Sequence, residues 1–365
     1  MTPPVLFLSY TSLFGGAERL LIDRAVALEG PVALACPEGE LAERARRAGM
    51  QVVLIRERRA ELRGGFADRA GAPARLGAQS AEVGQAIARL RPACVVGWSM
   101  RGLLVSAAGA VGARSRAPLV FAHNDLAPSP WVARAVRAAA SRADRVVALS
   151  RAIAEDLDPN ARLGVEVIPP GIDLERFRHS PPPSGDPVVV VLGAIIGWKR
   201  PDLALEAVAL AARELPGLRV RLAGAPLGEA GAELLARLRE RADRPDLQGR
   251  VTFEGAVSDT PALLSQATCL LHCADREPFG LALAEALACG RGVAAPAAAG
   301  PKEIVAPDCG VLYEPGNASA AAAALVETVR RAPELSHPAR ERAARLYDNR
   351  KALRRFRAVI EEVTT

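Results

Sequence analysis

The stretch CLLHCADREPFGLALAEALA, residues 269–288, contains an apolar run, a polar loop and a helical segment in that order. The run at residues 269–272 has the length and character of a buried strand. Alanine and leucine dominate residues 280–288, and both are strong helix formers. A strand that passes through a short loop into a helix is the repeating unit of a parallel sheet. This stretch therefore predicts the fold class α/β.

The same alternation continues along the whole chain. Short β-branched runs are separated by segments rich in alanine, leucine and arginine with helical spacing, such as residues 18–28 and 203–215. Continuous apolar strands between helices indicate parallel sheets that are covered on both faces. We predict two such doubly wound sheets. Their expected strands are residues 5–10, 32–36, 52–55, 94–98, 119–122, 145–148 and 165–168 in the first, and 188–193, 219–223, 251–253, 269–272, 293–295 and 311–313 in the second.

The break between the two series lies at SPPPSG, residues 180–185. Its three prolines have no amide proton to donate, so this stretch is neither helix nor central strand. We interpret it as a linker, which predicts domains over residues 1–180 and 181–345. A basic helix is expected at residues 346–365, packing back on the first domain. Ligands of doubly wound sheets bind at the carboxyl ends of the strands, which predicts a site in an interdomain cleft.

Composition excludes several classes of protein. Half of the 365 residues are hydrophobic and 24% are charged, which excludes a disordered chain. No apolar run reaches the ~18 residues of a membrane-spanning helix. The net charge is +6, but all except three of the 47 basic residues are arginine, so we attribute it to compositional bias and expect no nucleic-acid partner. The six cysteines form no Cys-x-x-Cys pair, which favours reduced thiols and a cytoplasmic location.

Residues 131–145 form a basic stretch in which Trp131 and two valines alternate with four arginines. A basic amphipathic helix of this kind binds an anionic membrane surface. Such contact would place the protein peripherally on the inner face of the membrane. The alternative is an ordinary helix with a solvated face, and the sequence leaves both interpretations open.

The start of the helix at residues 280–288 offers a phosphate site. Its first amides have no partner within the helix, and such ends bind phosphate groups. Glu277 precedes the helix and Glu285 lies two turns into it, so at 1.5 Å per residue they are up to ~12 Å apart. That separation suits a ligand with a central diphosphate and a sugar at each end, because carboxylates accept hydrogen bonds from hydroxyls. The alternative is a capped helix whose glutamates face water.

Three further positions follow predicted strands. Lys199 comes after residues 188–193 and can reach a diphosphate as a point charge. Gly16 follows the first strand, and paired glycines let the backbone approach a ligand closely. His123 ends the strand at residues 119–122, where it can contact a sugar. The alternatives are a solvated lysine, a tight turn and a structural histidine.

Cys269, His272 and Cys273 are the one cluster of metal-ligand residue types in the sequence. On a strand the two cysteines share one face while the histidine points to the other. We therefore favour a buried strand here and predict no metal.

Five motifs together resemble the family 4 retaining glycosyltransferases. They are GGAER at residues 15–19, ADRVVALS at 143–150, VIPPGID at 167–173, the Glu-x7-Glu stretch from Glu277 to Glu285, and GPKEI at 300–304. Their order and spacing cover nearly the whole chain. The resemblance implies the GT-B fold, which consists of two Rossmann-like domains with a cleft between them.

The resemblance also implies a role for each residue singled out above. Glu277 would contact hydroxyls of the transferred sugar, and Glu285 would bind the nucleotide ribose. Lys199 would neutralise the diphosphate, and His123 would line the sugar. The implied catalytic residues are Glu277, His123 and Lys199, and the implied donor-binding residues are Gly16, Lys199, Arg200, Glu277, Phe279, Gly280, Leu281 and Glu285.

One departure from the family pattern concerns the loop of Lys199. The family usually has arginine directly after the glycine of this loop, and here that residue is Ala194. A second cation on the leaving diphosphate is then absent, unless Arg200 compensates.

The function implied is a retaining, metal-independent hexosyltransferase without a cofactor. It would move a sugar from a GDP- or UDP-linked donor to a glycan, a lipid-linked molecule or another hydroxyl acceptor. Two alternatives stay open. One is a non-catalytic nucleotide-sugar-binding protein of the same fold, which Ala194 favours, and the other is a GT-B nucleotide-sugar epimerase.

Overall fold

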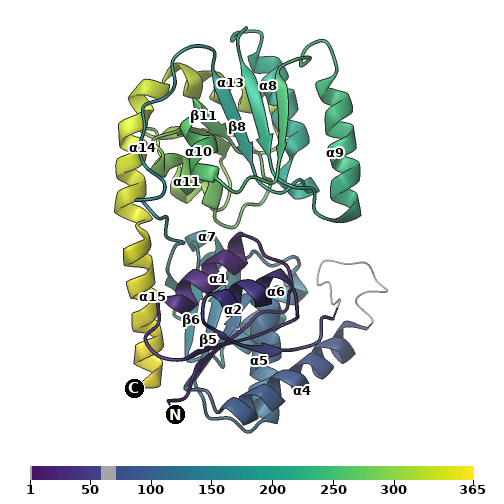
Figure 1. The fold of residues 1–365 in the computed structure, drawn as a ribbon, viewed down its shortest axis with the longest axis vertical. Helices are drawn as coiled ribbons and strands as arrows, with labels where there is room; N and C mark the ends of the chain where they lie inside the picture. Colours follow the sequence, from purple (N-terminus) through teal and green to yellow (C-terminus); the bar gives the residue numbers. More distant parts are fainter. Residues whose placement is uncertain (1, 59–70) are drawn as a thin grey trace. The chain divides into compact units, whose positions relative to one another are not determined.

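The computed structural model of the chain describes residues 2–58 and 71–365 (Figure 1). The chain divides into two units. The first unit consists of Met1–Pro170 together with Arg350–Thr365, and the second consists of Gly171–Asn349. Each unit is built around one parallel sheet, which confirms the predicted α/β class of two doubly wound, Rossmann-like domains.

The sheet of the first unit has the strand order β3-β2-β1-β4-β5-β6-β7. Every neighbouring pair in it is parallel. The strands are β1 (Val5–Leu8), β2 (Val32–Cys36), β3 (Gln51–Leu54), β4 (Cys94–Trp98), β5 (Leu119–His123), β6 (Arg145–Ala148) and β7 (Glu166–Val167). The helices of this unit are α1 (Gly16–Val26), α2 (Glu40–Arg47), α4 (Ala72–Leu90), α5 (Ser99–Gly112), α6 (Pro130–Ala140), α7 (Arg151–Leu157) and α15 (Asn349–Thr364).

The sheet of the second unit has the order β10-β9-β8-β11-β12-β13 and is also parallel. Its strands are β8 (Val188–Leu192), β9 (Arg219–Ala223), β10 (Val251–Gly255), β11 (Cys269–Leu271), β12 (Gly292–Pro296) and β13 (Gly310–Tyr313). A short 3-10 helix, η1, spans Gly197–Lys199. The α-helices are α8 (Pro201–Ala211), α9 (Gly228–Ala242), α10 (Thr260–Ser265), α11 (Leu281–Ala288), α12 (Pro301–Ile304), α13 (Ala318–Arg330) and α14 (Ala332–Leu346).

The core of the second unit lies on both faces of its sheet, because successive side chains of a strand point to opposite faces. Val189 and Leu271 are buried in one apolar cluster, and Val190 and Leu270 are buried in another. Helices cover both faces, so the strands are apolar throughout and show no alternation of polar and apolar residues. This is why the sequence reads as continuous apolar runs.

The strand order of each sheet reverses at one strand. β1 lies between β2 and β4, and β8 lies between β9 and β11. Loops on either side of such a strand lead to opposite faces of the sheet, which leaves a crevice at the carboxyl ends of the strands. In the second unit, β8 leads to Lys199 and its neighbour β11 leads to Glu277.

The boundary between the units lies after Pro170 and not in the proline-rich stretch at residues 180–185, where the sequence predicted it. The residues after Pro170 are held within the second unit. Ile172 pairs with Asp348, and Phe177 is fully buried. The fully buried Arg291 donates to the main-chain oxygen of Ser180 at 2.7 Å. The prolines therefore lead into β8 within one unit.

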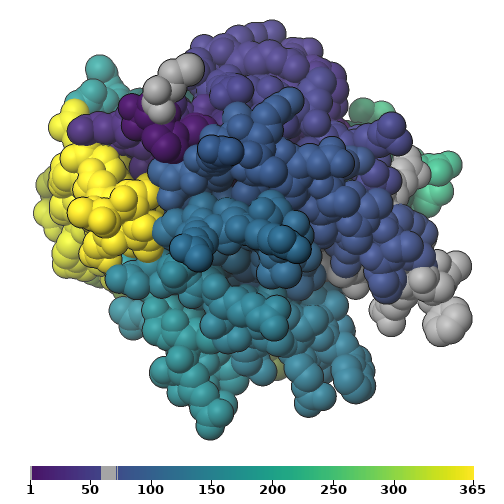
Figure 2. All heavy atoms as spheres, turned by 90° about the horizontal axis from the view of Figure 1, so that it is seen from below, coloured from purple at the N-terminus to yellow at the C-terminus, as the bar shows by residue number. Residues whose placement is uncertain are grey.

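The C-terminal helix α15 belongs to the first unit, starting from Arg350. Phe356 is fully buried there, and its ring centroid lies 6.3 Å from that of Phe7 on β1. Figure 2 shows the yellow C-terminal residues lying against purple residues of the N-terminal segment. The guanidinium of Arg24 on α1 is 4.8 Å from the Phe356 ring centroid and donates to the main-chain oxygen of Ile168 at 2.7 Å. Burial lowers the pKa of Arg24 to about 9.

No helix within residues 2–58 and 71–365 combines the length and the apolar character that crossing a bilayer requires.

Candidate functional site

The carboxyl edge of the second sheet brings Lys199, Glu277 and His272 together. β8 and β11 are neighbours in register, with Val189 opposite Cys269. The loop after β8 carries Lys199, and the loop after β11 carries the other two residues. Because parallel strands end at the same edge of a sheet, the two loops meet there.

The side chains of Lys199 and His272 both lie against the same carboxylate oxygen of Glu277. The ammonium group of Lys199 contacts Oε2 of Glu277. Nε2 of His272 lies 3.2 Å from the same oxygen. Glu277 and His272 are both buried, with 7% and 5% of their surfaces exposed. The Trp198 ring lies beneath the lysine, with its centroid 4.2 Å from Nζ. The result is a buried carboxylate held by an ammonium group and an imidazole.

Burial by itself would raise the pKa of the Glu277 carboxyl. The positive charge of Lys199 and the nearby His272 outweigh this effect, and they lower the pKa to about 2. Glu277 is therefore ionised at neutral pH. An ionised carboxylate is a strong acceptor for hydroxyl groups, so the site can bind a polyhydroxy ligand.

The two loops are also joined through their main chains and through Arg200. The amide of Asp275 donates to the main-chain oxygen of Trp198 at 3.1 Å. Arg200 is paired with Asp275 at 3.2 Å and with Asp202 at 3.1 Å. The guanidinium of Arg200 is thus paired with two carboxylates. This pairing weakens the expectation that Arg200 compensates for Ala194 by contacting the diphosphate.

Close approach of backbone segments explains two glycines near the site. A Cβ on Gly224 would lie 1.8 Å from the main-chain oxygen of Gly193, at the start of the Lys199 loop. A Cβ on Gly300 would lie 2.2 Å from the main-chain oxygen of Phe279. A side chain at position 224 would push the loop after β9 away from the Lys199 loop, and a side chain at position 300 would push the loop after β12 away from the Glu277 loop.

The helix after Glu277 begins at Leu281, slightly later than the sequence predicted. Its N-cap is Gly280, with φ +110°, which has no side chain to cap the helix. The N-cap residue therefore supplies no side-chain acceptor to the amides of the first turn, and such helix starts bind phosphate groups. The Phe279 side chain is buried, with its ring centroid 5.5 Å from that of Tyr347. Phe279 is thus a core residue through its side chain.

Glu285 lies on α11 and is 6% exposed. The alternative of a helix whose two glutamates face water is therefore wrong for both Glu277 and Glu285. A carboxylate is rarely buried unless it is paired or hydrogen-bonded. Two such residues on one strand–loop–helix unit are consistent with a ligand site.

Gly16 and His123 belong to the first unit. Gly16 is the exposed first residue of α1, and Glu18 accepts from the amide of its neighbour Gly15 at 3.1 Å. His123 ends β5 and is 1% exposed, with its ring stacked on Phe121 at 4.8 Å between centroids. Burial lowers the pKa of His123 to about 3, so its ring is neutral at physiological pH. Among the described residues, Nδ1 of His123 has no hydrogen-bond partner.

Ser99 lies beside His123 and was not predicted as a site residue. Trp98 at the end of β4 pairs with Ala122 of β5, and the residues that follow them are Ser99, the first residue of α5, and His123, the last residue of β5. Ser99 has φ +71°, a conformation that serine rarely adopts. Its buried Oγ has no partner within the described part of the chain. Backbone strain of this kind concentrates at functional sites.

His272 is the main site residue that sequence reasoning missed. The sequence indicated only a metal-ligand residue type on a strand. The structure supports the buried-strand interpretation for Cys269 and Cys273, because burial raises the pKa of both thiols to about 12 and keeps them protonated. The described residues contain no group of three or more histidine, cysteine, aspartate or glutamate side chains placed to hold a metal ion. The signal that could have found His272 is its place directly after a strand next to that of Lys199.

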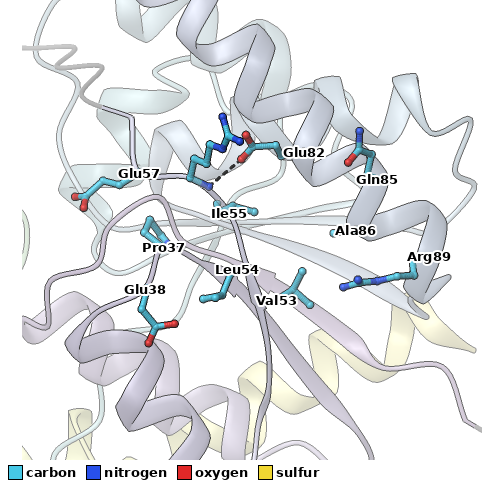
Figure 3. Close-up of a pocket in the computed structure, with 11 residues that line it drawn as sticks. Pro37, Glu38, Val53, Leu54, Ile55, Glu57, Glu82, Gln85, Ala86 and Arg89 are labelled. Carbon is cyan, nitrogen blue, oxygen red and sulfur yellow. Dashed lines mark hydrogen bonds between the residues drawn. The ribbon is translucent and has the colours of Figure 1, made fainter.

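A separate hollow of about 890 Å³ lies beside β3 and α4 in the first unit (Figure 3). Within it, Oε2 of Glu82 accepts from the amide of Arg56 at 2.9 Å. None of the predicted site residues lines it. Its lining residues are Pro37, Glu38, Val53, Leu54, Ile55, Arg56, Glu57, Glu82, Gln85, Ala86 and Arg89.

Comparison with known families identifies the chain. Residues 14–176 match the family described as Glycosyltransferase Family 4, and residues 173–346 match Glycosyl transferases group 1. The chain belongs to the family 4 glycosyltransferases of GT-B fold. The recognition made from the five motifs is thereby confirmed.

Curated relatives of this family 4 chain match over part of its length. The D-inositol 3-phosphate glycosyltransferase of Mycolicibacterium paratuberculosis is 38% identical over 149 residues. That match covers 37% of this chain and 32% of the relative. The chain thus spans about a third of the length of the relatives it matches.

Solved structures match over nearly the whole chain. Anabaena HepE in complex with UDP-glucose has a TM-score of 0.83 and 24% identity, covering 99% of this chain and 100% of its own. Sucrose-phosphate synthase from Thermosynechococcus elongatus has a TM-score of 0.78 and 19% identity, covering 99% of both chains. At these identities the likeness establishes the GT-B fold.

The ionised form of Glu277 should stabilise the folded protein, because its pKa of about 2 lies below the ordinary value of 4.5. This contribution is complete above pH ~4.5 and is lost as the pH falls towards 2. The free energy of unfolding of the wild type minus that of Glu277→Gln should therefore fall by about 3 kcal/mol across that interval. Urea denaturation at a series of pH values measures the difference, and a constant value would contradict the assignment.

Proposed function

We propose that the protein is a retaining glycosyltransferase that uses a nucleoside diphosphate sugar. The observation that carries the proposal is the cluster of Lys199 with the buried His272 and Glu277, next to the start of α11, whose N-cap is a glycine. This arrangement combines a cation and helix amides for a diphosphate with a carboxylate for sugar hydroxyls. Its position at the strand-order reversal of a doubly wound sheet is where such folds bind ligands.

Within the second unit, each residue has a proposed contact. The amides at Gly280 and Leu281 bind the diphosphate, and Lys199 neutralises its charge. Glu277 accepts hydrogen bonds from the transferred sugar, and Glu285 accepts them from the ribose. A lysine has three donors, so Lys199 can contact the diphosphate while it stays beside Glu277.

For the first unit, we propose that His123 contacts the transferred sugar through its neutral ring. Gly16 is proposed to approach the diphosphate or the acceptor through its exposed main chain. The low pKa of His123, which burial lowers to about 3, excludes a role as a cationic acid at neutral pH.

The donor we propose to test first carries UDP. Support comes from the fold, because HepE was crystallised with UDP and with UDP-glucose. A GDP-linked donor is the second choice. The acceptor we propose is a hydroxyl-bearing glycan, lipid-linked molecule or small polyol. The names of the curated relatives, which glycosylate inositol 3-phosphate, support a phosphorylated polyol among these.

The mechanism depends on charge that develops as the nucleoside diphosphate leaves. Lys199 and the amides of α11 are aimed at that charge, and preorganised groups of this kind stabilise a transition state. We propose that the acceptor attacks from the same face and that the leaving phosphate takes its proton. No covalent nucleophile and no metal are needed, because the cation and the helix amides supply the stabilisation.

A non-catalytic nucleotide-sugar binder is the second candidate. Ala194 favours it, because this small exposed residue stands where the family usually has arginine, and Arg200 is already paired with Asp202 and Asp275. Release of free UDP in the presence of an acceptor separates transfer from binding. Calorimetric binding without release would favour the second candidate.

We also propose a cytoplasmic location, with peripheral contact to an anionic membrane. All six cysteines are free and buried, which suits a reducing compartment. The predicted basic stretch is a helix only over Pro130–Ala140, and Arg145 begins β6 instead. On α6, Trp131 is 76% exposed, and the guanidinium of Arg134 lies 5.4 Å from its ring centroid. An exposed tryptophan beside an arginine suits the headgroup region of a bilayer.

Glu277→Ala should reduce the transfer rate at least ~100-fold, because it removes a contact that strengthens in the transition state. Glu285→Ala should instead weaken donor binding about tenfold, with a smaller effect on kcat. Coupled detection of released UDP gives kcat and KM, and calorimetry gives the donor Kd. Glu233→Ala, a change on the exposed side of α9, serves as the control. Wild-type rates in Glu277→Ala would contradict the proposed site.

The product should keep the anomeric configuration of the donor. NMR of the anomeric proton, recorded early in the reaction, measures this directly. Turnover should be unchanged in EDTA, because the stabilising charges belong to the protein. An inverted product or full loss of activity in EDTA, restored by magnesium, would overturn the mechanism.

Wild-type protein should sediment with vesicles of anionic phosphatidylserine and less with neutral phosphatidylcholine, and salt should weaken the binding. The double variant Trp131→Ala, Arg134→Glu should bind several-fold less. The matched control is Leu227→Ala, Arg219→Glu, which makes the same charge change at exposed positions of the second unit. Equal binding of the two double variants would contradict a role for α6.

A further inference from the structure

The main chain of His272 is held in place by neighbouring strands and not by its own loop alone. Its amide donates to the main-chain oxygen of Ala294 on β12 at 2.9 Å. Its main-chain oxygen accepts from the hydroxyl of Tyr313 on β13 at 2.6 Å. Tyr313 is itself buried and also contacts Sγ of Cys273 at 3.2 Å. The main chain of His272 is therefore fixed from two strands of the sheet.

The position of Nε2 determines the chemistry of the ring. This atom is buried and lies 3.2 Å from Oε2 of Glu277. The contact has the distance of a hydrogen bond but not its direction, because Nε2 has no geometrically aligned partner among the described residues. At 3.2 Å, the two atoms are close enough for a hydrogen bond once the N–H group is aligned with Oε2. The carboxylate only accepts, so Nε2 must carry a proton to be stable there.

Donor binding would change the surroundings of Glu277. In the ligand-free protein, Lys199 and His272 both contact Oε2. A bound diphosphate attracts the ammonium group of Lys199. If Lys199 moved alone, a buried carboxylate would lose its main counter-charge, which is strongly unfavourable. A second donor on the same oxygen prevents this.

We infer that His272 is a positioning residue for Glu277, a role that rests on the proposed function. Its Nε2–H group holds Oε2 while Lys199 engages the diphosphate, and it leaves Oε1 to accept from a sugar hydroxyl. His272 thereby couples the orientation of Glu277 to the fold of the sheet. It contacts no reacting atom itself.

Other charged groups face this cluster and must be considered in any pH experiment. The ring lies next to Lys199 and Glu277, and the Tyr313 hydroxyl and Cys273 thiol lie at its main chain. The adjacent loops carry a further ion-paired set, which consists of Arg200, Asp202 and Asp275. Glutamine and leucine at position 272 carry no charge, so the pH dependence of these variants comes from the remaining groups.

The test compares His272→Gln with His272→Leu. The glutamine amide keeps an N–H donor near the position of Nε2, whereas leucine fills similar space without a donor. We expect His272→Leu to lower kcat/KM for the nucleotide sugar about 10- to 100-fold and His272→Gln to restore it to within about fivefold of wild type. Affinity for UDP alone should change less than twofold in both variants, because UDP lacks the transferred sugar that Glu277 is proposed to contact.

A double-mutant cycle separates positioning from a structural role. In the Glu277→Gln background, His272→Leu should have almost no further effect on kcat/KM, because its target is gone. Independent losses that multiply would overturn the inference. Equal kinetics of His272→Leu and wild type would also overturn it, while leaving the proposed function intact.

A readout without turnover keeps the inference testable if no donor is found. The stability of His272→Gln and His272→Leu is measured by urea denaturation between about pH 2 and 5, where Glu277 contributes. The midpoint pH of that contribution should be higher in the leucine variant, because Glu277 has lost a donor. Identical profiles would overturn the inference. Failure of wild type to bind any nucleotide sugar would instead count against the proposed function alone.

Discussion

The parallel pairing of β8 with β11 is the constraint on which the candidate site depends. Lys199 and Glu277 are 78 positions apart in the sequence. They meet because their strands are neighbours that end at the same edge of the sheet. An ion pair between two exposed loops would contribute little to stability. At this edge the carboxylate is buried, so the ammonium group and the imidazole decide whether it stays ionised.

Burial of Glu277 strengthens its interactions with charged neighbours, and it also makes the loss of those neighbours costly. A buried carboxylate interacts strongly with its neighbours because little water screens the charges. The same burial would destabilise Glu277 if its partners were lost. Neighbouring loops pack tightly against the two loops that carry Lys199 and Glu277, with Gly224 against Gly193 and Gly300 against Phe279. The absence of a Cβ at positions 224 and 300 thus allows this close packing on either side of the charged pair.

Much of the fold and part of the site could be predicted from the sequence. The apolar runs and the helical spacing are local patterns, and they place the strands within a few residues. The Glu-x7-Glu stretch is also local, which is why Glu277 and Glu285 were found. The sequence did not predict the site positions of His272 and Ser99 or the ion pairs of Arg200. Each of these features depends on contacts with residues distant in the chain. The unit boundary was placed too late for the same reason, since Arg291 holds Ser180 from a different part of the second unit.

The sequence by itself determined that the chain is α/β, that it contains two parallel sheets, and that one strand–loop–helix unit carries two glutamates around a helix start. These properties follow from periodicity and residue preference over short windows. Only the tertiary structure decided that Glu277 is buried and ionised, that Lys199 and His272 share its Oε2, and that residues 171–185 belong to the second unit. Burial and charge pairing are set by strand order, and strand order depends on contacts that no local pattern encodes.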